Sequence, residues 1–289
     1  MMIGFVILHY ITSEYTIKTI DSILENVKGE KVIVVVDNAS PNNSLDDIKK
    51  HYTNNKEIKY LKLPKNVGFA NGNNAGYQFI REHYTAEFIT VLNNDVLLTQ
   101  NNFYSLLEES YEKNHFGILG PDVFSMRDGR HQNPEALNNF TLADLEAKRK
   151  KIKLKLRLKF LIFLKWKLKK VKKVNYKAYE PTFDKRKVTQ DDVILHGSIY
   201  VFSKDFILNE DECFYGKTFM YMESYILYYL AKKKNYNVIY DPSIEVIHYE
   251  DVSTDISVKS KYKKAVFTLR CLLASTNSFI ELMRQDELD

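Results

Sequence analysis

The sequence is poor in cysteine, in long apolar runs and in leader-like residues at its start. Only two cysteines occur among 289 residues, Cys213 and Cys271, and they lie far apart in the chain. Such usage offers no disulfide framework and favours a reducing compartment. No window reaches about 18 uninterrupted apolar residues, so no simple membrane-spanning helix is expected. The opening MMIGFVILHY lacks a basic leader and a small-residue cleavage site, and we expect a first buried strand there rather than a signal peptide.

The glycine-rich stretch of this chain matches neither of two well-known phosphate-binding loops. The stretch NVGFANGNNAG, residues 66–76, contains three glycines and four asparagines. It has no Gly-Lys-Ser/Thr, which excludes a Walker A loop, and its glycines do not follow the G-x-G-x-x-G spacing of dinucleotide-binding proteins. The small residues would instead let a ligand approach the backbone closely, and the amide side chains could contact that ligand.

What the chain does contain is an alternation of strand and helix patterns through its first half. The run KVIVVVD is continuous and β-branched, as in a strand buried on both faces. SEYTIKTIDSILENV has the apolar spacing of an amphipathic helix. With an apolar content of 45%, this alternation predicts an α/β fold with a mostly parallel central sheet. Ligands bind such sheets at the carboxyl ends of the strands, and the polar clusters DNAS, PKNVGF and NND follow three of the expected strands.

Two of these polar clusters contain acids that could serve a ligand. Asp95, with Asn94 before it, follows an expected buried strand, and a carboxylate there can hold Mg²⁺ or Mn²⁺ beside substrate phosphates. Asp37 and Asn38 end another strand, where a carboxylate and an amide can hydrogen-bond a nucleotide base or ribose. Taken alone, each pair is more simply explained as a strand-ending turn, because Asn and Asp are common turn residues.

Seven short motifs occur in an order that resembles glycosyltransferase family 2, whose members have the GT-A fold. The resemblance extends over residues 2–253 and is closest to the rhamnosyl- and galactofuranosyl-transferase-like branch of bacterial polysaccharide synthesis. The motifs are VVDNAS (35–40), NVGFANGNN (66–74), LNNDV (92–96), GPDVF (120–124), HGSIYVFSKDF (196–206), FMYMES (219–224) and IEVIHYEDVS (244–253).

The resemblance implies roles for individual residues. Asp95 stands in the place of the family's metal-binding D-x-D motif, and His248 matches a histidine that can complete a site for Mn²⁺ or Mg²⁺. A neutral imidazole is a competent ligand, although a single histidine is more often structural. Nucleotide-sugar binding is implied for His9, Asp37, Asn38, Asn66, Gly68, Phe69, Asn73, Asn74 and Asn94.

The catalytic motif departs from the family pattern. Inverting sugar transfer needs a base within hydrogen-bond reach of the acceptor hydroxyl, and the resemblance implies a Glu-Asp pair at that place. Here Glu223 is present, but Ser224 replaces the Asp, Ile226 replaces a further acid, and an arginine often found one turn later is missing. A serine is a poor base near its free pKa. Either Glu223 accepts the proton, or it caps and orients the site without accepting one.

A strongly basic segment, residues 148–173, interrupts an otherwise acidic chain. Its 14 Lys and Arg contribute +14 to a net charge of +5, so the other residues sum to −9. Its large apolar side chains and Trp166 favour a segment that lies on an anionic membrane surface. Packing on the protein or on a partner is one alternative, and nucleic-acid binding is another. Since no nucleic-acid-binding module accompanies the segment, we expect no nucleic-acid partner.

The shape of this segment is less clear from its sequence. Thr141 and Asp144 occupy capping-box positions, and no Gly or Pro occurs between positions 134 and 181, which permits a long basic amphipathic helix. Residues 152–160, however, alternate apolar and basic side chains. That is the period of a strand, and on a helix it gives no single apolar face.

The predicted protein is a cytoplasmic, metal-dependent, inverting glycosyltransferase that lies peripherally at the inner face of the cell membrane. It would move a hexosyl or deoxyhexosyl group from a UDP- or dTDP-sugar to a lipid-linked glycan in cell-surface or capsular polysaccharide synthesis. The alternative, suggested by Ser224, is a weakly active or inactive sugar-nucleotide-binding or scaffolding subunit. The expected regions are a GT-A domain (1–256) with a nucleotide-sugar-binding half (1–125), the basic insert (140–175) and an acceptor-side half (186–256), followed by a helical tail (257–289).

Overall fold

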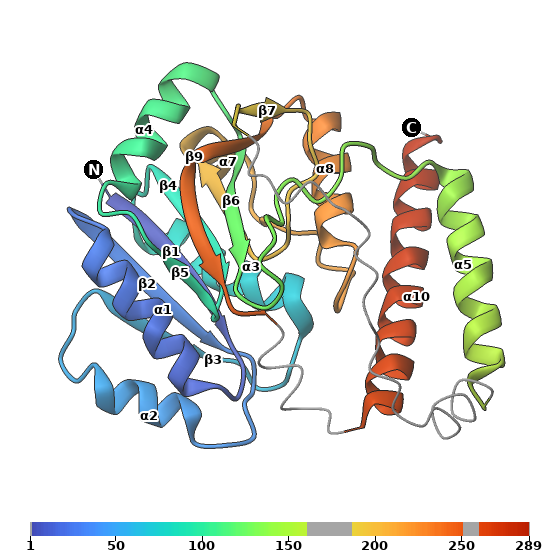
Figure 1. Cartoon of the computed structure of the whole chain (residues 1–289), viewed down its shortest axis with the longest axis horizontal. Coiled ribbons are helices and arrows are strands. Elements are labelled where there is room, and N and C mark those ends of the chain that lie inside the picture. The colour runs from blue at the N-terminus through green and yellow to red at the C-terminus, as the bar shows by residue number, and fades with distance from the viewer. Residues whose placement is uncertain (1, 161–186, 251–259, 289) are drawn as a thin grey trace.

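A nine-stranded sheet forms the centre of the molecule (Figure 1). The computed structural model describes residues 2–160, 187–250 and 260–288. The strands across the sheet follow the order β3-β2-β1-β4-β8-β6-β9-β5, and β7 pairs with β9. In chain order they are β1 Met2–His9, β2 Glu30–Asp37, β3 Ile58–Lys62, β4 Phe88–Asn93, β5 Val96–Leu98, β6 Ile118–Ser125, β7 Gln190–Asp191, β8 Ile199–Ser203 and β9 Val238–His248.

The directions of the strands confirm the predicted α/β fold with a mostly parallel sheet. β3, β2, β1 and β4 are successive parallel neighbours, and β6 is parallel to β9. β8 lies antiparallel between β4 and β6, so β6 and β9 run in the same direction as β1. Because β1, β2, β4, β6 and β9 all end at one edge, the residues that follow these strands meet in space.

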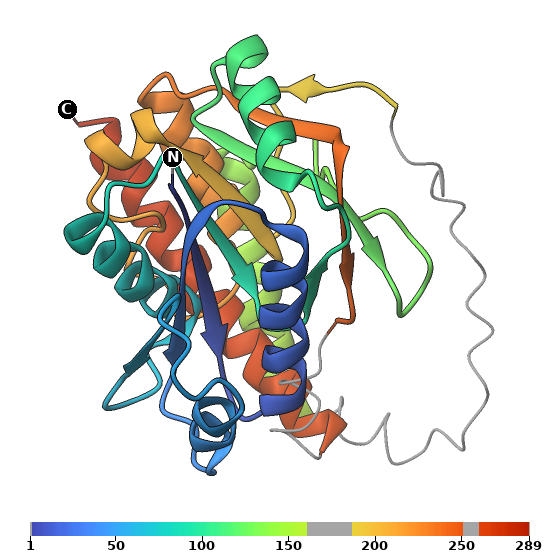
Figure 2. The ribbon, with the colours of Figure 1, turned by 90° about the vertical axis from the view of Figure 1, so that its left-hand side faces the viewer.

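Helices cover both faces of the sheet. α1, α2 and α4 pack on one face, where Ile20, Ile48 and Phe103 join the sheet residues in one core. α3, α7 and α8 pack on the other face through Tyr77, Phe206 and Leu227. Figure 2 shows α1 in front of the sheet and α10 behind it. The helix bounds are α1 Ser13–Asn26, α2 Ser44–His51, α3 Gly68–His83, α4 Phe103–Asn114, α5 Leu142–Arg157, α7 Lys204–Asn209, α8 Glu223–Lys233 and α10 Lys261–Asp286.

α5 and α10 form a third core with α8. The two helices lie side by side at one end of the molecule, with α8 between α10 and the sheet (Figure 1). Leu145 of α5, Phe279 of α10 and Ile226 of α8 are all fully buried in this core. The expected C-terminal helix is therefore confirmed as α10, and it is attached to the body through α8 and α5.

The described part of the basic segment is helical, and its alternating pattern places apolar residues on two opposite sides of α5. Side chains two positions apart are separated by about 200° around a helix. Ile152, one heptad after Leu145, is buried, whereas Leu154 and Leu158 are 57% and 38% exposed. The capping box of Thr141 forms as predicted. The strand-like alternation thus belongs to a helix with one side in the third core and the other facing solvent.

The rest of the basic segment, residues 161–173 with Trp166, lies outside the described residues. In the part of the chain that is described, no helix combines the length and the hydropathy that crossing a bilayer requires. The division of the chain into two halves, an insert and a tail stays a prediction.

Candidate active site

The predicted site residues come together at the carboxyl edge of the sheet. β1 ends at His9 and β2 ends at Asp37, and these two residues face each other in the strand register. Asp95 lies in the turn between β4 and β5, and His248 is the last residue of β9. Val96 pairs with His248 across the β5–β9 ladder, which brings Asp95 and His248 next to each other.

His9 lies beneath this edge and is fully buried. Its Nδ1 is 2.7 Å from Thr16 Oγ1 and its Nε2 is 2.8 Å from Ser44 Oγ, so the ring joins α1 to α2. Burial lowers the pKa of His9 to about 4, and the charge of Asp37 opposes this only in part. A neutral imidazole has one donor and one acceptor, and both are occupied inside the protein. This geometry makes His9 a brace, while a direct ligand contact stays a prediction.

Asn38 and Asn66 fix the loop that leads from β3 into α3. Asn38 Nδ2 donates to the Gly68 carbonyl oxygen at 3.1 Å, and Asn38 Oδ1 accepts from the Val67 N–H at 2.9 Å. Asn66 Oδ1 accepts from the Gly68 N–H at 3.0 Å. Both amides are therefore engaged with the backbone of this loop and hold it in one shape beside the sheet edge.

Gly68 allows this loop to touch the turn before α8. Its φ is +85°, and a Cβ at this position would lie only 2.1 Å from the carbonyl oxygen of Phe219. A side chain would thus meet both backbone strain and a backbone clash. The next N–H, that of Phe69, donates to the same Phe219 oxygen at 2.7 Å. The start of α3 is thereby joined to the segment that carries Glu223.

The two remaining predicted asparagines on α3 differ from each other. Asn74 Nδ2 donates to the Phe214 carbonyl oxygen at 2.8 Å, and Asn74 Oδ1 accepts from the Phe214 N–H at 2.9 Å. Asn73 Nδ2 donates to the Phe69 carbonyl oxygen at 3.0 Å, but its buried Oδ1 has no hydrogen-bond partner among the described residues. Asn74 therefore clamps a neighbouring segment, whereas Asn73 keeps an open acceptor.

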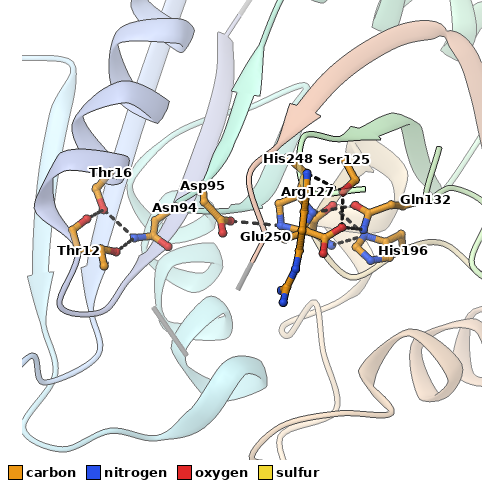
Figure 3. A network of polar contacts seen from close by, with 11 residues as sticks. Thr12, Thr16, Asn94, Asp95, Ser125, Arg127, Gln132, His196, His248 and Glu250 are labelled. Carbon is orange, nitrogen blue, oxygen red and sulfur yellow. Dashed lines mark hydrogen bonds and ion pairs between the residues drawn. The ribbon is translucent and has the colours of Figure 1, made fainter. Parts of the chain in front are cut away.

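Asn94 and Asp37 are both buried beside the edge. Asn94 Nδ2 donates to Thr12 Oγ1 at 2.8 Å and to Thr16 Oγ1 at 3.0 Å (Figure 3). Asp37 Oδ1 accepts from the Ser40 N–H at 3.0 Å. Because Thr16 also contacts the histidine at the end of β1, one hydrogen-bonded network joins the end of β1 to the turn after β4.

His248 faces Asp95, and a chain of polar residues fixes its ring (Figure 3). Nδ1 of His248 lies 2.8 Å from Gln132 Oε1, and Gln132 Nε2 donates to the carboxylate of Glu250. An ionised carboxylate can only accept, so Glu250 sets the orientation of the Gln132 amide. The amide oxygen then requires the proton on Nδ1. In the neutral ring Nε2 carries the lone pair, and it lies 3.3 Å from Asp95 Oδ1.

The pair of Asp95 and His248 fits a divalent cation. Asp95 Oδ1 is buried and accepts no hydrogen bond from the described residues. A protonated ring or a divalent cation would satisfy two electron-rich atoms that face each other in this way. The described residues hold no group of three or more His, Cys, Asp or Glu suited to a metal. Further ligands would therefore come from substrate phosphates and water, as is usual for Mg²⁺.

Glu223 stands at the first position of α8, after a strained turn. Tyr221 and Met222 both have φ of +72°, a left-handed conformation that costs on the order of 1–3 kcal/mol for each non-glycine residue and tends to occur at functional sites. Glu223 Oε1 is buried and has no hydrogen-bond partner among the described residues. Burial raises the pKa of Glu223 to about 7, and the charge of Glu135 adds to this against opposing hydrogen bonds. A carboxyl with such a pKa can serve as a base near neutral pH.

Glu135 is a second carboxylate at this place, and the sequence analysis missed it. Its side chain is exposed to water, and it comes within hydrogen-bonding reach of the side chains of Ser224 and Tyr225. The surrounding protein atoms reduce its hydration and raise the pKa of Glu135, against those hydrogen bonds and the positive charge of Lys148. Ser224 thus has an acidic residue before it on α8, Glu223, and a second one near it from the loop after β6, Glu135.

His196 also belongs to this edge. Its ring centroid lies 5.7 Å from that of His248, and its Nδ1 is 3.0 Å from Ser198 Oγ. Burial lowers the pKa of His196 to about 3, and the neighbouring His248 adds to the effect. His196 is therefore neutral. Its ring lies beside His248 of the Asp95–His248 pair, and the next residue, Gly197, lies close to Ser224.

The missed residues Gln132, Glu135, His196 and Glu250 lie in segments without regular periodicity. Gln132 and Glu135 follow β6, whose carboxyl end is at the same edge as the other motifs. Their position was the signal that could have found them, because polar residues shortly after a strand of a parallel sheet lie at its functional edge. His196 and Glu250 stood inside recognised motifs, but residue type alone assigned neither a role.

Comparisons with known proteins concern the family and the fold. Residues 5–167 match the family described as Glycosyl transferase family 2. No curated protein matches the chain. The crystal structure of S. aureus TarS 1-349 and that of the same fragment in complex with UDP are similar at 14% identity, with TM-scores of 0.52 and 0.54. In both cases the similarity covers 86% of this chain but 60% of the TarS fragment.

The likeness to TarS is one of fold, because the sequences are only 14% identical. It agrees with the GT-A arrangement of a mostly parallel sheet with its site at the carboxyl edge. The family match is independent of it and spans more than half of the sequence, including β1 to β6 and the Asp95 turn. The chain therefore belongs to glycosyltransferase family 2.

Proposed function

We propose that this protein is an inverting glycosyltransferase that uses a UDP- or dTDP-sugar. The observation that carries the proposal is the meeting, at one sheet edge, of a braced loop at the start of α3, the Asp95–His248 pair and Glu223 with its buried Oε1. Family membership supports the class of reaction. The structure of TarS with UDP, a protein of similar fold, supports a uridine nucleotide as the first donor to test.

In the proposed reaction Glu223 accepts the proton of the acceptor hydroxyl as its oxygen attacks the anomeric carbon. The new carbon–oxygen bond forms while the bond from the anomeric carbon to the diphosphate oxygen breaks, and the nucleoside diphosphate leaves with the bonding electrons. Asp95 and His248 would hold Mn²⁺ or Mg²⁺, which supplies Lewis-acid stabilisation of the leaving diphosphate when bound. Asn73, with its open Oδ1, would face the donor.

The test is release of nucleoside diphosphate from a panel of UDP- and dTDP-sugars with Mn²⁺ and candidate acceptors. We expect turnover with one donor, and loss of that turnover when the metal is chelated. Binding is followed in parallel by thermal shift, since a ligand that binds only the folded state raises its apparent stability. Binding of a nucleotide without turnover for any combination would instead support the alternative of an inactive sugar-nucleotide-binding or scaffolding subunit.

We further propose that the acceptor is a lipid-linked glycan and that the protein works at the inner, cytoplasmic face of a cell membrane, in cell-surface or capsular polysaccharide synthesis. The support is the outward side of α5. Leu154 is 57% exposed and Leu158 is 38% exposed, and Phe160 just beyond the helix is 56% exposed. They are interspersed with Lys and Arg, and such a surface suits an anionic bilayer. A rhamnosyl- or galactofuranosyl-transferase-like specificity is proposed on motif resemblance alone.

Co-sedimentation with vesicles tests the membrane proposal. Leu154→Ser with Leu158→Ser leaves the buried side of α5 intact, and we expect it to reduce pelleting with anionic vesicles and to leave thermal stability unchanged. The matched control is Leu208→Ser on α7, an apolar side chain that is 74% exposed elsewhere on the molecule. Pelleting of the α5 variant equal to that of the control would contradict the proposal.

A further inference from the structure

Two acidic residues from distant parts of the chain lie close to Ser224. Glu223 comes from the start of α8, and Glu135 comes from the loop between β6 and α5. The Glu135 side chain reaches the hydroxyl of Ser224, and its charge acts on Glu223. Ser224 Oγ itself lies 3.8 Å from where a Cβ on Gly197 would be, and Gly197 follows His196, whose ring lies beside that of His248. Ser224 therefore follows Glu223 directly in the chain and has Glu135 near its side chain.

The loop that presents Glu135 is anchored on both sides. The Glu135 N–H donates to the carbonyl oxygen of Ile194 at 2.8 Å. Two residues earlier, Asn133 donates to the Pro121 carbonyl oxygen at 2.8 Å and accepts from the His196 N–H at 2.8 Å. These contacts hold the Glu135 backbone against the same edge that carries His196. Glu135 thus sits at a defined place, although its side chain is exposed to solvent.

A contact on the other side ties α8 to this loop. Asn139 Nδ2 donates to the carbonyl oxygen of Tyr225 at 2.9 Å, and the rings of Phe140 and Tyr225 lie 4.8 Å apart. Lys148 lies over the Phe140 ring at 4.3 Å, and its charge acts on Glu135. The loop after β6 and the first turn of α8 are therefore joined, and this places Glu135 beside the start of α8.

We propose that Glu135 supplies, from another segment, the second acid of the acceptor site, and that it acts on Glu223 through Ser224 and through its own negative charge. The inference rests on the proposed glycosyltransferase function. It makes Glu135 a positioning residue, while Glu223 remains the group that accepts the proton. It also accounts for Ser224: the acid that the family resemblance leads one to expect at position 224 is provided by position 135.

The charge of Glu135 has a direct consequence for Glu223. A negative neighbour makes a carboxylate hold an incoming proton more strongly, and it helps a base work near neutral pH. Among the described residues, the other titratable groups that interact with Glu223 are Tyr200 and Cys271, which are neutral near pH 7. Lys148 of α5 acts on Glu135. Glu135 is therefore the charged neighbour whose removal should be visible in the pH dependence.

The first experiment compares Glu135→Gln with Glu109→Gln, a control at an exposed position on α4. With the donor and acceptor that support wild-type turnover, we expect Glu135→Gln to lower kcat about tenfold or more and to move the acid limb of the kcat–pH profile to lower pH. Donor binding and thermal unfolding should match the wild type. Glu135→Asp keeps the charge and should keep the position of the acid limb.

The second experiment places an acid at position 224, where the family resemblance leads one to expect it. Ser224→Asp in the Glu135→Gln background places a carboxylate directly on α8, and we expect it to recover most of the lost kcat and to return the acid limb towards its wild-type position. If the wild type turns over and the kcat–pH profile of Glu135→Gln equals that of Glu109→Gln, the inference is overturned. It is also overturned if the double variant folds but recovers none of the lost kcat. Absence of wild-type turnover with every donor would instead refute the proposed function itself.

Discussion

The two sides of the site use polar residues in opposite ways. On the side of β1, β2 and α3, the side chains of His9, Asn38 and Asn74 are engaged with hydroxyls or backbone of the protein itself. On the side of β9 and α8, one carboxylate oxygen of Asp95, Oδ1, and one of Glu223, Oε1, are buried without a hydrogen-bond donor among the described residues. The first arrangement gives shape, and the second leaves charge available for a ligand or a proton.

A polar side chain at the functional edge therefore need not touch a ligand. An amide that braces a loop stabilises the fold, and its loss leaves buried groups unsatisfied. A buried carboxylate without a donor destabilises the fold to some degree and is retained where its reactivity is useful. Substitutions on the bracing side should therefore lower stability, and substitutions on the reactive side should lower activity at unchanged stability.

The largest expected effect comes from Glu223→Gln. Loss of a general base lowers kcat by roughly 10²–10⁴-fold, while the isosteric amide removes a desolvated acid and should leave thermal stability equal or higher. Nucleotide release and thermal unfolding measure the two quantities on the same sample. Activity close to that of the wild type would show that Glu223 only orients the site.

A clear effect on stability is expected from Gly68→Ala. The added Cβ would meet the Phe219 carbonyl oxygen at 2.1 Å in a left-handed conformation, so both strain and a backbone clash oppose it. Gly29→Ala is the matched control, because Gly29 also has a positive φ, +92°, but nothing lies within 4 Å of its Cβ position. Strain alone costs on the order of 1–3 kcal/mol.

Chemical denaturation distinguishes these two glycine variants. We expect the free energy of unfolding to fall clearly more for Gly68→Ala than for Gly29→Ala, because only the first must move the turn that precedes α8. Equal losses for the two variants would mean that the contact between the α3 loop and Phe219 adds nothing, and the bracing side would lose its main support.

A smaller effect is expected in the pH dependence of stability. The pKa of His9 is lowered by burial from 6.5 to about 4 in the folded protein, so the unfolded chain binds a proton there first as pH falls. The contribution of His9 to the free energy of unfolding is complete above pH 6.5. It decreases as pH falls from 6.5 to about 4, by up to about 3 kcal/mol in total.

His9→Asn tests this dependence by unfolding at a series of pH values. We expect the variant to be less stable at neutral pH and to lose less stability than the wild type between neutral pH and about 4. Part of the dependence should remain, because burial also lowers the pKa of His196, to about 3. A pH dependence identical to that of the wild type would show that His9 is not held neutral.

Much of the fold could be predicted from local patterns. The β-branched run of β2 and the polar residues after β1, β2 and β4 define a parallel sheet and its functional edge, because strand period and strand ends are local properties. The alternation in α5 was harder to interpret. It fits a strand period, and only the position of α10 shows that Ile152 is buried while Leu154 is exposed on the opposite side of a helix.

Parts of the site could not be predicted because they depend on contacts between distant segments. Gln132 has significance only beside His248, 116 positions away in the chain. Glu135 has significance only beside Ser224, and neither residue carries a pattern that points to the other. Bracing roles were hidden for the same reason, since the partner of Asn74 is the backbone of Phe214, whose position no local motif reveals.

The most direct test of the account is the pH dependence of kcat for sugar transfer by the wild-type protein at saturating donor and acceptor. Burial raises the pKa of Glu223 to about 7, and a protonated Glu223 cannot accept the acceptor proton. We therefore expect kcat to fall as pH drops through about 7, and we expect this limb to be absent from any residual activity of Glu223→Gln. A kcat that stays constant across this range, or the same limb in Glu223→Gln, would contradict this expectation.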